Sequence, residues 1–391
     1  MKRKICIVTG SRAEYGLLKP LLEEIRRDRQ LVAQLVVTGM HLSSEFGLTY
    51  REIEKDGFFI DAKVKMPLAS DSAVGISKSI GIGLMCFARV YERLRPDIVV
   101  LLGDRFELLG PSIAAMVGKI PLAHINGGEV TEGAFDDAIR HSITKMSHLH
   151  FTSANIYSKR VIQLGENPKS VFTVGQLSLD SIKRTRLLPK KALEKELKFK
   201  FNTRNLLVTF HPVTLERDNG QNQLRHLLKV LDRLKDTNII FTKSNADTGG
   251  RLINRIITEY VSKRKNKAVA FTSMGQLKYF STMQFVDALV GNSSSGIVEA
   301  PFFKIATINI GDRQKGRIRV KSIIDCWPTK KSIKEALSRL YSIEFQKNLK
   351  NIAYPYGDGT AAKKIKDILK SYNIKNILKK SFYNVSFNNR Y

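Results

Sequence analysis

The sequence predicts an α/β protein built from two doubly wound domains that face a cleft. Short, nearly continuous apolar runs alternate with amphipathic stretches, which is typical of a parallel sheet covered by helices on both faces. This alternation occurs twice, once in each half of the chain. A length of 391 residues is too long for one ordinary domain and comfortable for two, and a hydrophobic fraction of 43% is enough for two cores.

Six apolar runs in the first half are expected to form strands, and the stretches between them to form helices. The strands are expected at residues 4–9, 34–38, 97–103, 122–126, 148–152 and 171–174, and the clearest helices at 16–29, 76–94 and 107–117. Together these elements predict an N-terminal domain over residues 1–185.

The second half repeats the pattern and predicts a C-terminal domain over residues 204–360. Its strands are expected at residues 205–210, 238–242, 268–271, 288–290 and 305–310. The basic, proline-containing segment 186–203 is the expected hinge. Residues 361–391 are expected to form a helix and a frayed tail that pack back on the N-terminal domain.

The formal net charge of +29 first raises the question of a nucleic-acid partner. However, the excess is spread over segments 190–200, 263–267, 330–334 and 363–390, and no nucleic-acid-binding motif concentrates it. We therefore expect no nucleic-acid partner. A basic surface suits an anionic ligand such as a nucleotide diphosphate, or a weak approach to an anionic membrane.

The cysteine content and the N-terminus favour a reducing compartment. Cys6, Cys86 and Cys326 are few, odd in number and scattered, which argues against a disulfide framework or a cysteine zinc site. The apolar run after the basic start is too short for a signal peptide, and no run is expected to span a bilayer. The predicted location is the cytoplasm, without stable membrane insertion.

Polar clusters directly follow many of the expected strands. In doubly wound folds, ligands bind at the carboxyl ends of the strands, so the site should lie in the cleft between the domains. The first cluster contains Ser11 and Arg12 in a glycine-containing turn that could hold an anion, although Ser11 could simply cap the helix. The glycine fingerprint of nicotinamide-binding folds is absent there. His41 lies in the turn after the second strand.

Carboxylates gather after the next two strands. Asp104 ends the strand 97–103, where it could serve as an acid or a base, or as a helix cap. The segment 124–141 carries three glycines, four carboxylates and two histidines. Crowded carboxylates shift each other's pKa values, which suits acid–base chemistry. A purely structural role is least convincing for Glu129, on the glycine-rich loop.

The C-terminal domain offers a nucleotide-binding pattern. His211 follows its first strand, and the next residue, Pro212, ends that strand, so His211 is expected at the cleft. The segment 292–299 places three serines and a glycine at a helix start, which predicts a phosphate cradle, with Glu299 one turn further on. Arg313 closes the next strand, where it could contact a base or a phosphate.

In this order the clusters resemble the hydrolysing UDP-N-acetylglucosamine 2-epimerase family, and most of all its bacterial sialic-acid and legionaminic-acid pathway members. The resemblance covers residues 4–370 and rests on the motifs at 11–15, 103–105, 127–129, 136–141, 211–214, 291–294 and 311–314. It implies two Rossmann-like domains arranged as in the glycosyltransferase-B architecture, with the nucleotide held mainly by the C-terminal domain. It also implies that no metal or redox cofactor is needed.

The resemblance implies a reaction in which the nucleoside diphosphate leaves C1 while a proton leaves C2, followed by addition of water. The acid–base residues it implies are Asp104, Glu129 and Asp136, while His211 would meet the diphosphate or the leaving oxygen. The implied substrate and nucleotide contacts are Arg12, Ala13, His41, His124, Asn126, Arg140, Asn245, Ser293, Ser294, Glu299 and Arg313. A homodimer or homotetramer is expected.

Two departures from the family pattern affect the catalytic loop. Many relatives carry a glutamate at the position of Asn126, and an asparagine cannot shuttle a proton, so Glu129 is one replacement. The loop is also one residue longer before Asp136, which leaves Asp136 and Asp137 as alternatives. The sugar and the nucleotide, UDP or GDP, stay open. A nucleotide-sugar glycosyltransferase of the same architecture is the alternative function, although the loop holds more acid–base groups than a simple transfer needs.

Overall fold

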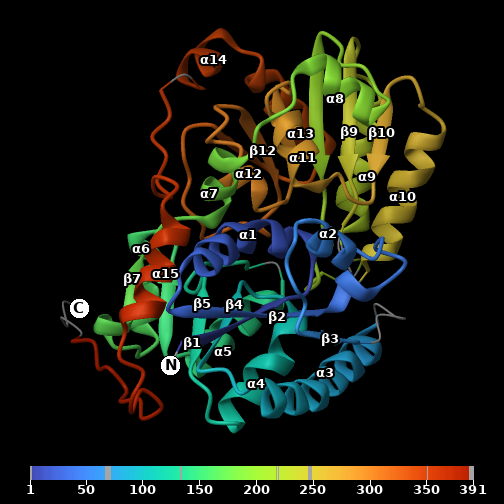
Figure 1. Ribbon diagram of the computed structural model, residues 1–391. Helices are drawn as coiled ribbons and strands as arrows, with labels where there is room; N and C mark the ends of the chain where they lie inside the picture. Colours follow the sequence, from blue (N-terminus) through green and yellow to red (C-terminus); the bar gives the residue numbers. More distant parts are fainter. Residues whose placement is uncertain are drawn as a thin grey trace.

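The computed structural model describes residues 2–66, 72–132, 134–216, 218, 220–244, 249–349 and 351–386. Within these residues the chain forms two parallel sheets, stacked one above the other in Figure 1. The N-terminal sheet has seven strands in the order β3-β2-β1-β4-β5-β6-β7. Their bounds are β1 Arg3–Thr9, β2 Leu31–Thr38, β3 Ala62–Val64, β4 Ile98–Leu102, β5 Leu122–Ile125, β6 Leu149–Thr152 and β7 Val171–Thr173.

The second sheet has six described strands in the order β10-β9-β8-β11-β12-β13. Their bounds are β8 Arg204–Thr209, β9 Thr237–Thr242, β10 Ala268–Phe271, β11 Ala288–Gly291, β12 Ala306–Ile310 and β13 Ile323–Cys326. All strand pairs are parallel, including the central pairs β1–β4 and β8–β11. In each sheet the strand order reverses at that central pair, which creates the switch point where doubly wound folds bind ligands.

Helices cover both faces of each sheet, as the alternating pattern predicts. Around the first sheet lie α1 Arg12–Arg27, α2 Tyr50–Lys55, α3 Ala73–Leu94, α4 Leu109–Val117, α5 Asp136–Met146, α6 Asn155–Gln163 and α7 Leu177–Arg184. Around the second lie α8 Lys190–Leu197, α9 Gln221–Leu231, α10 Gly250–Ser262, α11 Gly275–Met283, α12 Ser295–Val298, α13 Lys330–Leu340 and α14 Ile343–Leu349. The fold class predicted from the sequence is confirmed.

The segment expected as a hinge contains the helix α8. Leu193 and Leu197 of this helix are buried with Met283 and Leu289 in the core of the C-terminal domain. The chain therefore passes between the domains in the few residues between α7 and α8.

The last described helix, α15 Ala361–Ser371, packs on the N-terminal domain against α1 and α7, and Figure 1 shows it returning there from the C-terminal domain. Ile365 and Leu369 are buried in the same core as strands β1 and β4. The Asp180 carboxylate on α7 accepts the backbone N–H groups of Ala361 and Ala362 at 3.1 and 3.0 Å. The chain thus crosses between the domains twice.

The length and apolar composition of helix α3 do not fit the expectation that no segment could span a bilayer. Among the described helices it is long and apolar enough to cross a membrane by length and composition. Its charges at Lys78 and Arg89 leave only ten uncharged residues between them, so no unbroken apolar run stood out in the sequence. In the fold α3 packs lengthwise along α4.

Candidate active site

Two adjoining cavities lie where the carboxyl ends of the two sheets face each other. The smaller has a volume of about 200 Å³ and the larger of about 320 Å³. Both are lined from both domains, and they share the residues Ser11, Ala13, Leu17, His211, Ser294 and Glu299. The cavities therefore form one divided cleft at the two switch points.

Most residues predicted from the sequence line this cleft. The smaller cavity contains Ala13, Asp104, Asn126, Glu129, Asp136, Arg140, His211, Ser294, Glu299 and Arg313, and the larger one adds Arg12 and Ser293. Asn245 lies outside the described residues. The histidines His41 and His124 line neither cavity.

The two histidines lie beneath the cleft wall, where they support turns. His124 is buried, with Nε2 at 2.7 Å from the Gly103 carbonyl and Nδ1 at 3.0 Å from the Thr144 hydroxyl. His41 is held between the hydroxyls of Thr9 and Thr49. Burial lowers the pKa of each ring to about 3, so both are neutral. Neither histidine lines the cleft, so the structure places both behind its wall, and the substrate contacts expected for them stay predictions.

A buried arginine organises the carboxylates of the smaller cavity. Arg140 on α5 donates to the Asp104 carboxylate and, at 3.3 Å, to the Thr131 hydroxyl. Burial by itself would raise the pKa of Asp104, but the neighbouring guanidinium groups, Arg140 first among them, bring that pKa below its usual value. Asp104 is therefore ionised and can accept a proton from a ligand.

Glu129 is buried at the domain boundary. Its carboxylate accepts hydrogen bonds from the Ser153 hydroxyl at 2.8 Å and the Gln176 amide at 3.1 Å. Its other oxygen lies 2.8 Å from Nη1 of Arg317, while Arg140 is more distant at 4.0 Å. The Glu129 carboxyl group is thus held by an arginine of the opposite domain.

Arg317 is a site residue that the sequence analysis missed. Besides Glu129, it donates to the Val130 carbonyl at 2.9 Å and is buried against the glycine-rich loop of the N-terminal domain. Its turn also carries Arg313 and Gln314, whose side chains donate to the Asn292 carbonyl at 3.2 and 2.9 Å. This turn therefore connects the serine loop after β11, which follows Asn292, to the glycine-rich loop that carries Glu129 and Val130. The available signal was a second arginine, four residues after Arg313, in a turn already singled out.

The structure separates the two aspartates that the sequence left as alternatives. Asp136 begins α5 and lines the smaller cavity. Asp137 does not line it; its carboxylate accepts the Thr131 N–H at 2.6 Å and lies 3.5 Å from Nε2 of His141. Asp137 therefore braces the loop, and Asp136 faces the cleft.

Two further carboxyl groups in the cleft have raised pKa values. Burial raises the pKa of Glu14 and that of Glu299 to about 7. Glu14, on the first turn of α1, accepts the Gly10 N–H at 2.7 Å. At neutral pH each group is therefore protonated in a large fraction of the molecules and can donate a proton or a hydrogen bond. Glu14 lies within the motif at residues 11–15, but the sequence does not single it out, since its burial cannot be read from the sequence.

The backbone conformation at position 126 helps to explain why this chain has an asparagine where many relatives have a glutamate. Its φ of 64° is in the left-handed region, which asparagine tolerates better than most residues. The side chain donates to Gln176 Oε1 at 3.2 Å, and Gln176 in turn donates to Glu129. Asn126 thus helps to position the Glu129 carboxylate through the side chain of Gln176.

The C-terminal wall of the cleft is built by the serine loop after β11. The Asn292 side chain accepts the His211 N–H at 2.7 Å and donates to the His211 carbonyl at 2.9 Å, which joins this loop to the end of β8. A Cβ at Gly291 would lie 2.0 Å from the Thr209 carbonyl oxygen, so the close approach requires glycine. The α12 start therefore presents backbone N–H groups and Ser294 to the cleft.

Arg12 joins the two domains at the larger cavity. Its guanidinium lies 2.7 Å from the Glu52 carboxylate and donates to the Ser273 hydroxyl of the opposite domain at 2.6 Å. Arg251 of the C-terminal domain pairs likewise with Glu45 at 2.8 Å. In the part of the chain that the structure describes, no group of three or more histidine, cysteine or acidic side chains is placed to hold a metal ion.

Comparison with known proteins gives consistent matches over nearly the whole chain. The family model described as UDP-N-acetylglucosamine 2-epimerase matches residues 23–370. The GDP/UDP-N,N'-diacetylbacillosamine 2-epimerase (hydrolyzing) of Campylobacter jejuni is 49% identical, covering 97% of this chain and 99% of that protein. The polysialic acid biosynthesis protein P7 of Escherichia coli is 40% identical, covering 98% of each chain. The UDP-N,N'-diacetylbacillosamine 2-epimerase (hydrolyzing) of Legionella pneumophila is 34% identical, with coverages of 95% and 96%.

Solved structures agree with the fold. The UDP-GlcNAc 2-epimerase of Neisseria meningitidis bound to UDP-GlcNAc superposes with a TM-score of 0.78 at 19% identity, covering 94% of this chain and 99% of that one. The Methanocaldococcus jannaschii UDP-GlcNAc 2-epimerase in complex with UDP-GlcNAc and UDP gives a TM-score of 0.79, with the same identity and coverages.

Proposed function

Because the chain belongs to the UDP-N-acetylglucosamine 2-epimerase family and is an enzyme, we propose that it is a hydrolysing 2-epimerase of a nucleotide-diphospho 2-acetamido sugar. Its products are the free 2-epimer and a nucleoside diphosphate, and its role is in nonulosonic acid synthesis. The observation that carries this proposal is the group of three carboxylates, Asp104, Glu129 and Asp136, opposite a serine loop in one cleft. The carboxylates suit proton transfer, and the serine loop suits a diphosphate.

The reaction we infer has two stages. A carboxylate takes the proton from C2 while the C1–O bond breaks. The electron pair of the C1–O bond leaves with the nucleoside diphosphate, and the electron pair of the C2–H bond forms the new double bond. The resulting 2-acetamidoglucal has a double bond between C1 and C2. Water then adds its hydroxyl to C1, and a proton is delivered to the opposite face of C2.

The proposed roles follow the two walls of the cleft. Asp104, ionised beside Arg140, and Glu129 share the proton transfers at C2, and Asp136 assists them. His211 meets the diphosphate or the leaving oxygen where the two cavities join. Nucleotide contacts are assigned to Arg12, Ser293, Ser294, Glu299 and Arg313.

The substrate we favour is UDP-N,N'-diacetylbacillosamine, with UDP-N-acetylglucosamine as the alternative sugar. The relatives that are 49% and 34% identical carry the diacetylbacillosamine name. The product is then a 2,4-diacetamido-2,4,6-trideoxymannose. We also propose a cytoplasmic location, consistent with three free cysteines.

The test is incubation with UDP- and GDP-linked N,N'-diacetylbacillosamine and with UDP-N-acetylglucosamine, without any acceptor and in deuterated water. The expected result is release of nucleoside diphosphate and of a free sugar that carries deuterium at C2. A glycosyltransferase would retain the donor until an acceptor is added. Retention of all three donors would overturn the proposal.

We infer further that the enzyme is a homo-oligomer that associates through α3 and α4. Val74, Met85, Met116 and Val117 on these helices are 46–71% exposed to solvent. The helices α3 and α4 are in contact, and apolar side chains exposed on neighbouring helices suit a protein–protein contact.

A further inference from the structure

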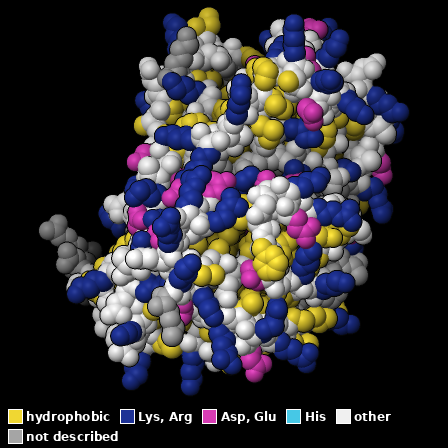
Figure 2. Space-filling model, viewed as in Figure 1, with side chains coloured by type: hydrophobic (Ala, Val, Ile, Leu, Met, Phe, Trp, Pro, Cys, Tyr) yellow, Lys and Arg dark blue, Asp and Glu magenta, His cyan; other side chains and the backbone are white. Residues whose placement is uncertain are grey.

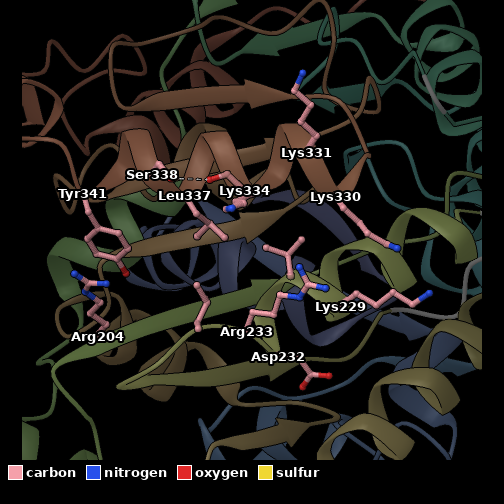
Figure 3. A pocket seen from close by; sticks show the side chains of 12 residues that line it. Arg204, Lys229, Asp232, Arg233, Lys330, Lys331, Lys334, Leu337, Ser338 and Tyr341 are labelled. Carbon is pink, nitrogen blue, oxygen red and sulfur yellow. Dashed lines mark hydrogen bonds between the residues drawn. The ribbon is translucent and has the colours of Figure 1, made fainter.

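Six cationic residues line a groove on the C-terminal domain that shares no residue with the active-site cleft. Elsewhere the positive charge is scattered, as the blue side chains in Figure 2 show for one face. The groove has a volume of about 960 Å³ and lies between α9 and α13. Its cations are Arg204, Lys229, Arg233, Lys330, Lys331 and Lys334. Figure 3 shows Arg233 and Lys334 on opposite sides of the groove, with Lys331 pointing away.

Few acidic side chains lie near these cations, so most of the positive charge of the groove is not neutralised. Asp232 is the acidic residue that lines the groove, and Arg264 holds it with Nη2 at 2.6 Å from Oδ2. Among the described residues, no ion pair is found for Arg233, Lys330 or Lys334. The α9–α13 groove is therefore a strongly positive surface.

The helix ends in the groove do not offset its charge. The carbonyl groups at the end of α9 would repel an anion, but the Lys267 ammonium donates to the carbonyls of Leu231 and Leu234 at 3.0 and 2.7 Å. The α13 helix begins in the groove, so its positive dipole end adds to the lysines.

An exposed tryptophan lies three residues before the start of α13, whose first residues line the groove. Trp327, the single tryptophan of the chain, is 74% exposed. The next residue, Pro328, accepts a hydrogen bond at 2.8 Å from Nδ1 of His226 on α9, which places this turn beside the groove. Val230 and Leu337 provide an apolar floor. Tryptophan beside clustered lysines is the combination typical of the membrane–water interface.

We propose that the α9–α13 groove docks the protein on the phosphate headgroups of an anionic phospholipid membrane, with Trp327 entering the interface. The groove lysines are long and exposed, so they can reach headgroups at a surface without being buried. A stacked single strand of nucleic acid would need a series of aromatic side chains, whereas the groove itself is lined by one, Tyr341, covered by Arg204 at 4.2 Å.

The single tryptophan makes the test direct. Fluorescence of the full chain is recorded with vesicles of phosphatidylcholine alone and of phosphatidylcholine with phosphatidylglycerol, alongside sedimentation with the vesicles. We expect a blue shift and sedimentation only with the anionic vesicles, both weakened by salt. Absence of the shift would overturn docking at this face. Equal binding of a soluble oligonucleotide, with no binding to vesicles, would also overturn it.

Matched double variants separate this groove from general positive charge. Lys330→Ala/Lys334→Ala should lower the partition coefficient onto anionic vesicles about 30-fold, at about fivefold per lysine. Lys191→Ala/Lys195→Ala removes the same charge from the exposed side of α8 and should leave binding unchanged. Both doubles should keep full turnover, because neither lies in the cleft. Equal weakening by the two doubles would contradict a specific docking face.

Discussion

Glu129 is held from two sides, by Ser153 and Gln176 of its own domain and by Arg317 of the other. We predict that Glu129→Gln lowers turnover by about 10²–10⁴-fold, since it removes a positioned proton-transfer group while keeping size and hydrogen bonding. Affinity for the nucleoside diphosphate should change little, because the serine loop is untouched. Steady-state kinetics and C2 deuterium incorporation measure both effects.

A matched control for this variant is Ser153→Ala, which removes one hydrogen bond but keeps the carboxylate. It should cost far less turnover than Glu129→Gln. If Glu129→Gln instead retains near-normal turnover, Glu129 only braces the loop and has no place in the mechanism.

Arg317 acts on the carboxylates without belonging to their domain. Its charge helps to lower the pKa of Asp104, so Arg317→Ala should raise that pKa. Because the base must be ionised, the acid limb of the kcat/KM pH profile should move to higher pH. Loss of the Glu129 contact should also reduce kcat by about 10²-fold through misplacement of the loop.

The control for Arg317 lies two residues earlier in the same turn. Lys315 makes an exposed pair with Glu132 at 3.2 Å, so Lys315→Ala should leave the pH profile in place. An unshifted profile in Arg317→Ala would mean that this arginine only joins the domains mechanically.

At the scale of elements, α15 depends on a cap supplied from another helix. Asp180→Ala leaves the N–H groups of Ala361 and Ala362 without their acceptor, so the free energy of unfolding should fall by about 2 kcal/mol. Denaturant unfolding monitored by circular dichroism measures it. Asp367→Ala, which removes the pairs that this half-exposed carboxylate makes with Lys363 and Lys366, should change stability by less than about 0.5 kcal/mol. Equal losses would show that the cap contributes nothing.

Most elements could be predicted because they carry strong local patterns. Buried central strands such as β4 are continuous apolar runs, and amphipathic helices such as α1 repeat at helical spacing. The strand β3 has three residues and β13 alternates buried with exposed positions at a sheet edge, so neither gave a run long enough to identify.

The place of the candidate site in the fold could be predicted from the sequence, but the contacts of its individual side chains could be predicted less well. Clusters after strands located Asp104 and the serine loop, because a parallel sheet places all carboxyl ends at one edge. Whether a side chain there faces the cleft or the core depends on packing, so the sequence cannot show that His41 and His124 line neither cavity. Arg317 meets Val130 across 187 positions of sequence, and no local pattern reports such a contact.

At the scale of the whole molecule, the α3–α4 surface should determine the assembly. We expect light scattering to give at least twice the 44.2 kDa mass of one chain. Met85→Glu/Val117→Glu places two charges in the apolar contact and should produce monomers. Ile156→Glu changes a half-exposed apolar residue on α6 and should leave the mass unchanged. A monomeric wild-type chain would contradict the inference.

The return of α15 to the first domain has a consequence for synthesis on the ribosome. The N-terminal sheet is complete once residue 173 has emerged, yet its core still lacks Ile365 and Leu369. At a translation rate of about 5–20 residues per second, the interval from the end of α7 to the end of α15 lasts roughly 10–40 s. During that time the surface that α15 will cover is open, and the nascent chain exposes it to chaperones. The N-terminal domain therefore finishes folding last, although it is made first.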